Sequence, residues 1–129
     1  MSQLALHQIR DIPAALDFAV ARATENVIAQ RQIANRPRDY VFRFSSDPAY
    51  ADPLIAQERI RLTPPLPTDG KPNWQATIDV SDVTVSQEAA TREAAAALAV
   101  VAGYLGDSVE IPDEILADDE AQALLAPVM

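Results

Sequence analysis

The chain has 129 residues, enough for one compact domain with a real core, and 49% of them are hydrophobic, which excludes a disordered chain. Cysteine is absent, so disulfides, thiolate metal sites and cysteine nucleophiles are excluded. No apolar run approaches the roughly 18 residues of a membrane span, and the first residues lack the basic start and apolar stretch of a secretory signal. We expect one domain, residues 1–129, with no membrane association.

The net charge of −9 is unevenly distributed along the chain. Residues 1–72 carry nine basic and eight acidic side chains, whereas residues 73–129 carry Arg92 against eleven acids. Two interpretations stay open. The molecule has two electrostatic faces, or it is acidic all round and kept soluble by self-repulsion.

The first elements along the chain are the least certain. Residues 13–35 are rich in helix-forming side chains, yet residues 27–31 alternate weakly as a strand would, so helix and strand both stay open. Residues 39–45 predict a strand, because Tyr40, Phe42 and Phe44 alternate with polar or smaller residues. The following Asp47-Pro48 would end it.

Two further alternations follow. Residues 59–63 place Ile60 and Leu62 on one face and Arg59 and Arg61 on the other. Residues 76–81 predict a third strand. The alternation shifts by one residue near Asp82, because Val83 and Val85 are out of phase with Val80. We expect a β-bulge there.

Two helices are expected last. Ser86 is a candidate N-cap for a helix that runs to Leu105 and ends at Gly106. Because residues 94–105 contain no charge, this helix should be enclosed on several sides. One small sheet covers only one side, so we infer that a partner subunit covers the rest. An acidic second helix or pair of turns is expected between Pro112 and Leu125.

No catalytic, metal or cofactor site is expected. His7 is the only histidine and has no partners in the sequence that would complete a zinc or catalytic site. The acids Asp118-Asp119-Glu120 fit a helix start better than a cation site. The three glycines form no phosphate-binding loop, so P-loop and Rossmann nucleotide binding are excluded, and we expect no small-molecule substrate.

The order of short strands, a loop, a last strand and two helices resembles the coat proteins of single-stranded RNA bacteriophages. Residues 32–43 resemble the family's basic turn, which leads into a strand that opens with tyrosine. Residues 74–88 resemble its last strand running into a capped helix, and residues 95–108 resemble its first helix and the turn that follows.

The resemblance implies an α+β fold with an antiparallel sheet at about residues 1–85 and a helical region at about residues 86–126. The two helices would interlock with those of a second subunit, and the dimers would assemble into an icosahedral (T=3) shell around single-stranded genomic RNA. The virion would form in the cytoplasm of a bacterial host. The family's coat dimers also repress translation by binding an RNA hairpin, and the resemblance extends that activity to this chain.

The resemblance also implies site residues. The candidates for RNA contact on the sheet are Arg31, Arg43, Arg59, Arg61 and Thr77. The candidates for packing between the subunits' helices are Val100, Val101, Tyr104 and Leu105. Asp39 and Asp79 depart from the family's pattern by placing acids on the RNA-facing side, and this argues against hairpin recognition more than against packaging.

Two other classes of function remain. The first is a small acidic interaction module, such as an immunity or inhibitor protein, whose C-terminal acids would bind a basic protein partner. Self-assembly separates it from a coat protein, because an inhibitor stays a monomer or dimer. A small enzyme is the third class, and it would need titratable groups that converge in one pocket.

Overall fold

The structure is a computed structural model that describes residues 2–66, 68, 70 and 72–116. It confirms the mixed α+β class with antiparallel pairing, but not the expected order of strands followed by helices. The elements in chain order are β1 Ser2–Ala5, α1 Leu6–Ile9, α2 Pro13–Ala23, α3 Val27–Asn35, α4 Pro48–Glu58, β2 Arg61–Thr63, β3 Trp74–Val80, β4 Val83–Ala89, α5 Arg92–Leu105, β5 Ser108–Ile111 and α6 Asp113–Leu116.

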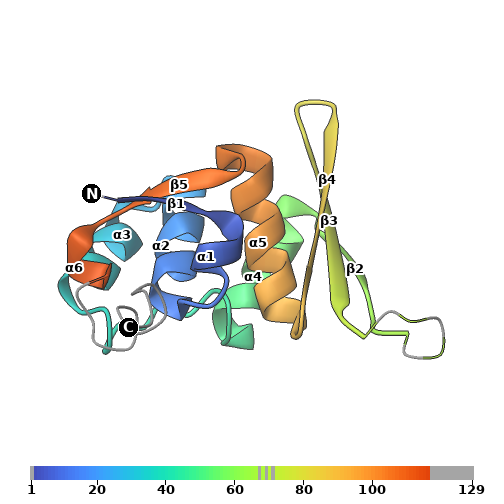
Figure 1. Cartoon of the computed structure of the whole chain (residues 1–129), viewed down its shortest axis with the longest axis horizontal. Helices are drawn as coiled ribbons and strands as arrows, with labels where there is room; N and C mark the ends of the chain where they lie inside the picture. Colours follow the sequence, from blue (N-terminus) through green and yellow to red (C-terminus); the bar gives the residue numbers. More distant parts are fainter. Residues whose placement is uncertain (1, 67, 69, 71, 117–129) are drawn as a thin grey trace, which may run out of the picture.

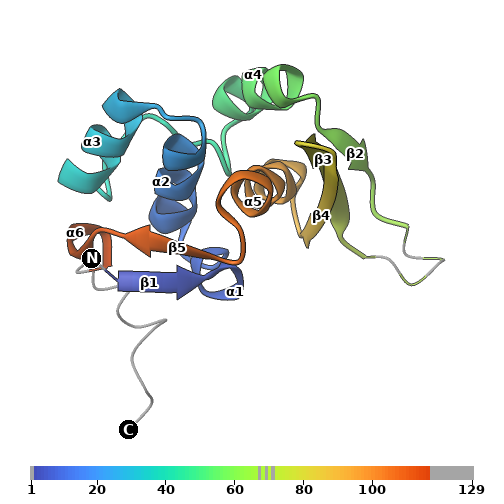
Figure 2. The same cartoon turned by 90° about the horizontal axis from the view of Figure 1, so that it is seen from above.

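The elements are arranged around α2 and α5, which run through the middle of the molecule (Figures 1 and 2). The β1–β5 pair and α1 lie on one side of these helices, and α3 and α4 lie on the other (Figure 2). The β2–β3–β4 sheet packs against α5 at one end, with β4 toward the side of α1 and β2 toward the side of α4 (Figure 2). We call these two sides the β5 side and the α3 side.

The two central helices are buried around their whole circumference over part of their length. In α2 every residue from 15 to 21 is buried, and in α5 every residue from 95 to 101 is buried. Most of these side chains are alanine or valine, which lets neighbouring elements approach closely. The sequence therefore predicted the enclosure of α5 correctly. Its cover comes from α2, α4, β5 and the sheet of the same chain, so no partner subunit is needed for it.

Both sheets are antiparallel and small. In the first, β1 pairs with β5, from Ser2 opposite Ile111 to Ala5 opposite Ser108. In the second, β3 is central, with β2 on one edge and β4 on the other. The inward residues Ala76 and Ile78 of β3 are buried against α5, whereas Thr77 and Asp79 point away from it.

The phase slip near Asp82 is a hairpin turn, and the expected bulge is wrong. Ser81 and Asp82 have φ of 49° and 69°, so both central residues adopt the left-handed conformation that a tight two-residue hairpin uses. Val83 then starts β4 in the opposite direction, paired with Val80. Glycine or asparagine is usual in such turns, which is why Ser-Asp gave no turn signal.

Because β4 extends to Ala89, the last long helix, α5, starts later than predicted. Ser86 lies in the strand and shares a hydrogen bond of 2.8 Å with Thr77, so the expectation of a helix cap at Ser86 is wrong. The cap is Thr91, whose hydroxyl accepts from the Ala94 N–H at 3.2 Å. The predicted end at Gly106 is confirmed, with φ of 87° at that residue.

The N-terminal half differs most from the expected sheet. Residues 13–35, left open between helix and strand, form α2 and α3. Asn26 caps α3 by accepting from the Ala29 N–H at 3.0 Å. The strand expected at 39–45 is wrong, because these residues form a loop with consecutive turns. Of the expected second acidic helix, α6 is described, and its remainder with Asp118-Asp119-Glu120 lies outside the described residues.

Gly103 sets how closely α5 approaches the hairpin. A Cβ at this position would lie 2.9 Å from Val80 Cγ2 and 3.2 Å from Ile78 Cγ2. Both neighbours are β-branched and have little rotamer freedom to move aside.

We expect Gly103→Ala to destabilise the protein by about 1–2 kcal/mol, because overpacking outweighs the better helix propensity of alanine. Urea unfolding followed by far-UV circular dichroism measures this. In the Gly103→Ala background, Val80→Ala should recover most of the loss, because it removes the methyl group in the way. An unchanged or higher stability of Gly103→Ala alone would contradict the tight contact.

Candidate functional site

The structure brings together only two of the five residues predicted to contact RNA. Arg61 on β2 lies opposite Thr77 on β3, on the face of the sheet that points away from α5. The Arg61 guanidinium already pairs with the Asp79 carboxylate, at 2.7 Å and 3.3 Å. This pairing raises the pKa of Arg61 and, with a hydrogen bond from Thr84, lowers the pKa of Asp79 to about 2.

The other three arginines lie apart from this pair. Arg59 is the exposed left-handed residue that ends α4, and Arg31 is exposed on α3. Arg43 lies in the loop before α4, with its guanidinium carbon 4.0 Å from the centre of the Tyr40 ring. Its guanidinium also donates to the Tyr40 and Arg38 carbonyls, so Arg43 holds the loop together.

The residues predicted to pack between subunits occupy two different environments. Val100 and Val101 are fully buried inside the single chain, so they present no surface to a second subunit in this fold. Tyr104 is 47% exposed and donates a hydrogen bond to the Glu58 carboxylate, which raises the pKa of Tyr104. Leu105 is half-buried.

One buried polar cluster escaped the sequence analysis. Asp17 lies in the middle of α2 with no exposed surface, and its carboxylate accepts from the Tyr40 hydroxyl and, at 2.7 Å, from the Ser45 N–H. Burial raises the pKa of Asp17 to about 6, against the opposing effect of these hydrogen bonds. Burial and the Asp17 charge together raise the pKa of Tyr40. The cluster is closed to solvent and fixes the 36–47 loop on α2, which is a structural role.

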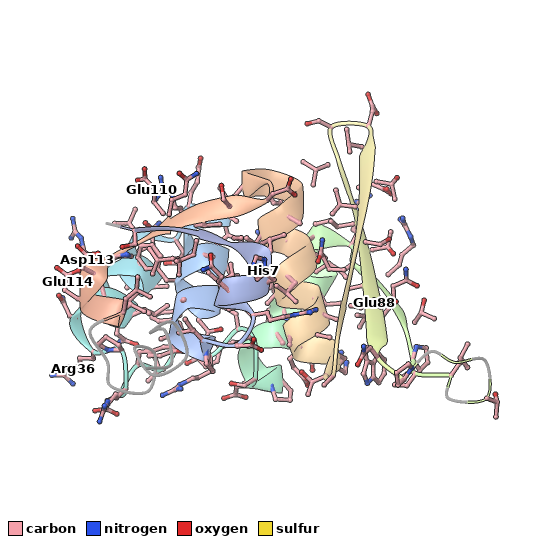
Figure 3. All side chains as sticks on the ribbon, viewed as in Figure 1. His7, Arg36, Glu88, Glu110, Asp113 and Glu114 are labelled. Carbon is pink, nitrogen blue, oxygen red and sulfur yellow. The ribbon has the colours of Figure 1, made fainter. Side chains whose placement is uncertain are left out.

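The exposed charges are separated between the two sides of the molecule. Acids lie on β4, β5 and α6 and at the turn before β5, on or toward the β5 side. Figure 3 shows Glu110, Asp113 and Glu114 together at one end and Glu88 on the hairpin at the other. The exposed acids from β4 to α6 are Glu88, Asp107, Glu110, Asp113 and Glu114.

The α3 side carries more of the arginines. Arg31 lies on α3, Arg36 ends that helix and Arg59 ends α4. In residues 73–129 the single basic side chain, Arg92, is bound to Asp52 at 2.8 Å and lies 3.6 Å from Glu93, so it does not neutralise the exposed acids of the β5 side. The β5 side therefore carries an excess of exposed acids over arginines, of which Arg10 and Arg22 donate to the Glu88 and Glu110 carbonyls there.

Two of the clefts formed by the described residues bear on function. One, of about 330 Å³, lies between α1 and β4; it is lined by Ala5, Leu6, His7, Arg10, Gln87, Leu98 and Asp107. The other, of about 270 Å³, lies under α4 beside the aromatic cluster of Phe42, Phe44 and Tyr50, whose ring centres are 5.7–6.2 Å apart. Neither cleft brings together an acid, a base and a nucleophile in hydrogen-bond contact among the residues that line it.

Within the described part of the chain, no group of three or more histidine, aspartate or glutamate side chains is placed to hold a metal ion. None of the helices described there is long and apolar enough to span a bilayer. Comparisons with protein-family models, with curated proteins and with solved structures found no match to this chain.

The buried Asp17 makes stability depend on pH. Its folded pKa of about 6 lies above the ordinary value of 3.8, so the folded state binds a proton more tightly than the unfolded state. Stability from this group therefore falls as the pH rises from about 4 to about 6, by roughly 2–3 kcal/mol in total. Asp17→Asn should flatten this dependence, measured by urea unfolding at pH 4 and pH 7.

The matched variant Asp17→Ala tests the cluster itself. It leaves the buried Tyr40 hydroxyl and Ser45 N–H without an acceptor, so we expect a loss of about 2–4 kcal/mol at both pH values. Because other acids also titrate in this range, the comparison is the difference between each variant and the unmutated chain. The same pH slope in Asp17→Asn and in the unmutated chain would show that Asp17 is not the group responsible.

Proposed function

We propose that this chain is a small acidic interaction protein that binds a basic protein partner through its β5 side. The observation that carries the proposal is the excess of exposed carboxylates from β4 to α6, which outnumber the two arginines, Arg10 and Arg22, that donate to the Glu88 and Glu110 carbonyls. Several acids on one side of a rigid core make the local electrostatic potential more negative, and this potential attracts a positively charged partner.

The partner is expected to associate fast and in a salt-dependent manner. Exposed interfacial charges act mainly by steering encounter, and salt screens them over roughly 8–10 Å. The proposed binding should therefore weaken as the salt concentration rises. Affinity beyond this steering needs contacts other than exposed charges.

A shell-forming RNA coat protein is the second candidate. One observation favours it, because Arg61 and Thr77 share the outward face of the sheet, as the resemblance implied. Against it, residues 13–35 form helices where that family has strands, and Val100 and Val101 are enclosed by their own chain. Size-exclusion chromatography and electron microscopy of the expressed chain separate the two: RNA-filled spheres would establish the coat function, and a monomer or dimer free of RNA is the result that we expect.

The binding function is tested by removing charge from one side at a time. Glu110→Gln with Glu114→Gln should weaken binding of the basic partner by about tenfold at low salt, because two steering charges are lost. The matched control is Glu25→Gln with Asp39→Asn, which removes two exposed acids outside β4, β5 and α6. Binding to proteins from the source cells is quantified for each variant.

The control pair should bind within about twofold of the unmutated chain. Equal losses in both pairs would show that net charge alone attracts the partner, and no loss in either pair would contradict a role for the β5 side. Circular dichroism checks that the fold is unchanged, which we expect because all four acids are exposed.

A further inference from the structure

We propose that the free edge of β4 binds an extended segment of the basic partner as an added β-strand, which rests on the proposed function and assigns its anchor. β4 pairs only with β3, and no strand in the described residues covers its other edge. The hairpin extends beyond the helices of the body (Figure 1), and Val83, Thr84, Ser86 and Glu88 on this strand are exposed.

The strand register decides which backbone groups are free. In a two-residue hairpin the residues that flank the turn are hydrogen-bonded to each other, and the pattern then alternates along the strands. Val83, Val85 and Gln87 therefore bond to β3, whereas the N–H and C=O groups of Thr84 and Ser86 point to the open edge. The Glu88 carbonyl, which follows the same pattern, accepts a hydrogen bond from Arg10 of the α1 segment.

Most of this edge lacks the features that prevent strand addition. Proteins block exposed edges with proline, charged side chains (above all lysine), a bulge, a very short strand or a covering segment. β4 has seven residues with a regular register and no proline or lysine, and such protection is confined to its end, where Glu88 is charged and its carbonyl is bound by Arg10. The opposite edge is blocked, because β2 has only three residues and is followed by Pro64-Pro65. The β4 edge is therefore the edge of this sheet that is suited to a partner strand.

The surroundings of β4 define the chemistry of the bound segment. On one face, a strand added beside β4 would place alternate side chains next to Val83, Val85 and Gln87, the last of which lines the cleft between α1 and β4. On the other face its side chains would lie beside Thr84, Ser86 and Glu88. Val83 and Val85 favour small aliphatic side chains on one face, and Glu88 favours lysine or arginine on the other, so the segment alternates basic and apolar residues.

A second copy of this chain fits the edge poorly. Pairing of two β4 strands would bring together two chains that each carry a net charge of −9 and an exposed Glu88 on this strand. Like charges placed opposite each other destabilise a strand pair. Charge complementarity therefore favours a basic segment from another protein.

The test uses a synthetic peptide of alternating arginine and valine, acetylated and amidated at its ends, added to the ¹⁵N-labelled full chain. We expect the amide protons of Thr84 and Ser86 to exchange with solvent at least about tenfold more slowly in the complex, because they become hydrogen-bonded. The control is the same peptide N-methylated at the residues that would pair, which keeps the charge and loses the backbone donors. Equal protection by both peptides, or protection only elsewhere, overturns the proposal.

A pair of variants isolates the backbone contribution. Ser86→Pro removes the edge-pointing N–H, and the control Ser86→Val keeps it while losing the same hydroxyl contact to Thr77. We expect Ser86→Pro to weaken peptide binding by at least about tenfold and Ser86→Val to change it by less than about threefold. Equal effects would overturn the assignment. The exchange measurement on the unmutated chain keeps the test valid if Ser86→Pro fails to fold.

Failure of the edge and failure of the proposed function give different results. If partner binding depends on Glu110 and Glu114 but the peptide leaves Thr84 and Ser86 unprotected, the acidic side binds without strand addition and the edge proposal is wrong. If these amides are protected but the charge variants bind normally, the edge proposal stands and the charge-driven function is wrong.

Discussion

The packing of α2 against α5 is the constraint on which the rest of the structure depends. Each helix is buried on all sides over seven residues, so each must be surrounded by other elements of the chain. The sheet covers one side of α5, and α3, α4 and the β1–β5 pair cover what remains of the two helices. Small alanine side chains make this possible, because they let backbones approach closely. Gly103 extends the same principle to the contact with β3, where even one methyl group has no room.

That buried centre also contains an acid, Asp17. Asp17 loses hydration at the middle of α2, and its two carboxylate oxygens accept the hydrogen bonds that hold the 36–47 loop on the helix. The aromatics of that loop alternate in sequence as they would in a strand. In the structure Tyr40 bonds to Asp17, and Phe42 and Phe44 pack with Tyr50 of α4. These alternating aromatic side chains therefore anchor a loop. Their spacing is the same as in a strand, so periodicity alone does not distinguish the two.

The elements predicted correctly are those that depend on residues close together in the sequence. The strand at residues 76–81, the charge-free helix and its end at Gly106 were predicted, because alternation, composition and a C-terminal glycine determine them directly. The hairpin turn at Ser81–Asp82 was missed, since neither residue is the glycine or asparagine that normally marks it. The Asp17 cluster could not be predicted, because Tyr40 and Ser45 lie 23 and 28 residues from Asp17 in the sequence and meet it only through tertiary packing. For the same reason, the sequence could not show that Arg31 and Arg43 lie apart from Arg61 in the folded chain.

Charge and edge geometry lead to the same side of the molecule by independent routes. The acids of β4, β5 and α6 are a property of composition, whereas the open edge of β4 follows from register and from the turn that reverses the chain. The carboxylates alone would attract any cation, with little selectivity and strong dependence on salt. An open edge alone would pair with any extended chain, including other copies of itself. Placed together, the acids disfavour self-pairing and the edge adds directional hydrogen bonds, so the combination selects an extended basic segment over both alternatives.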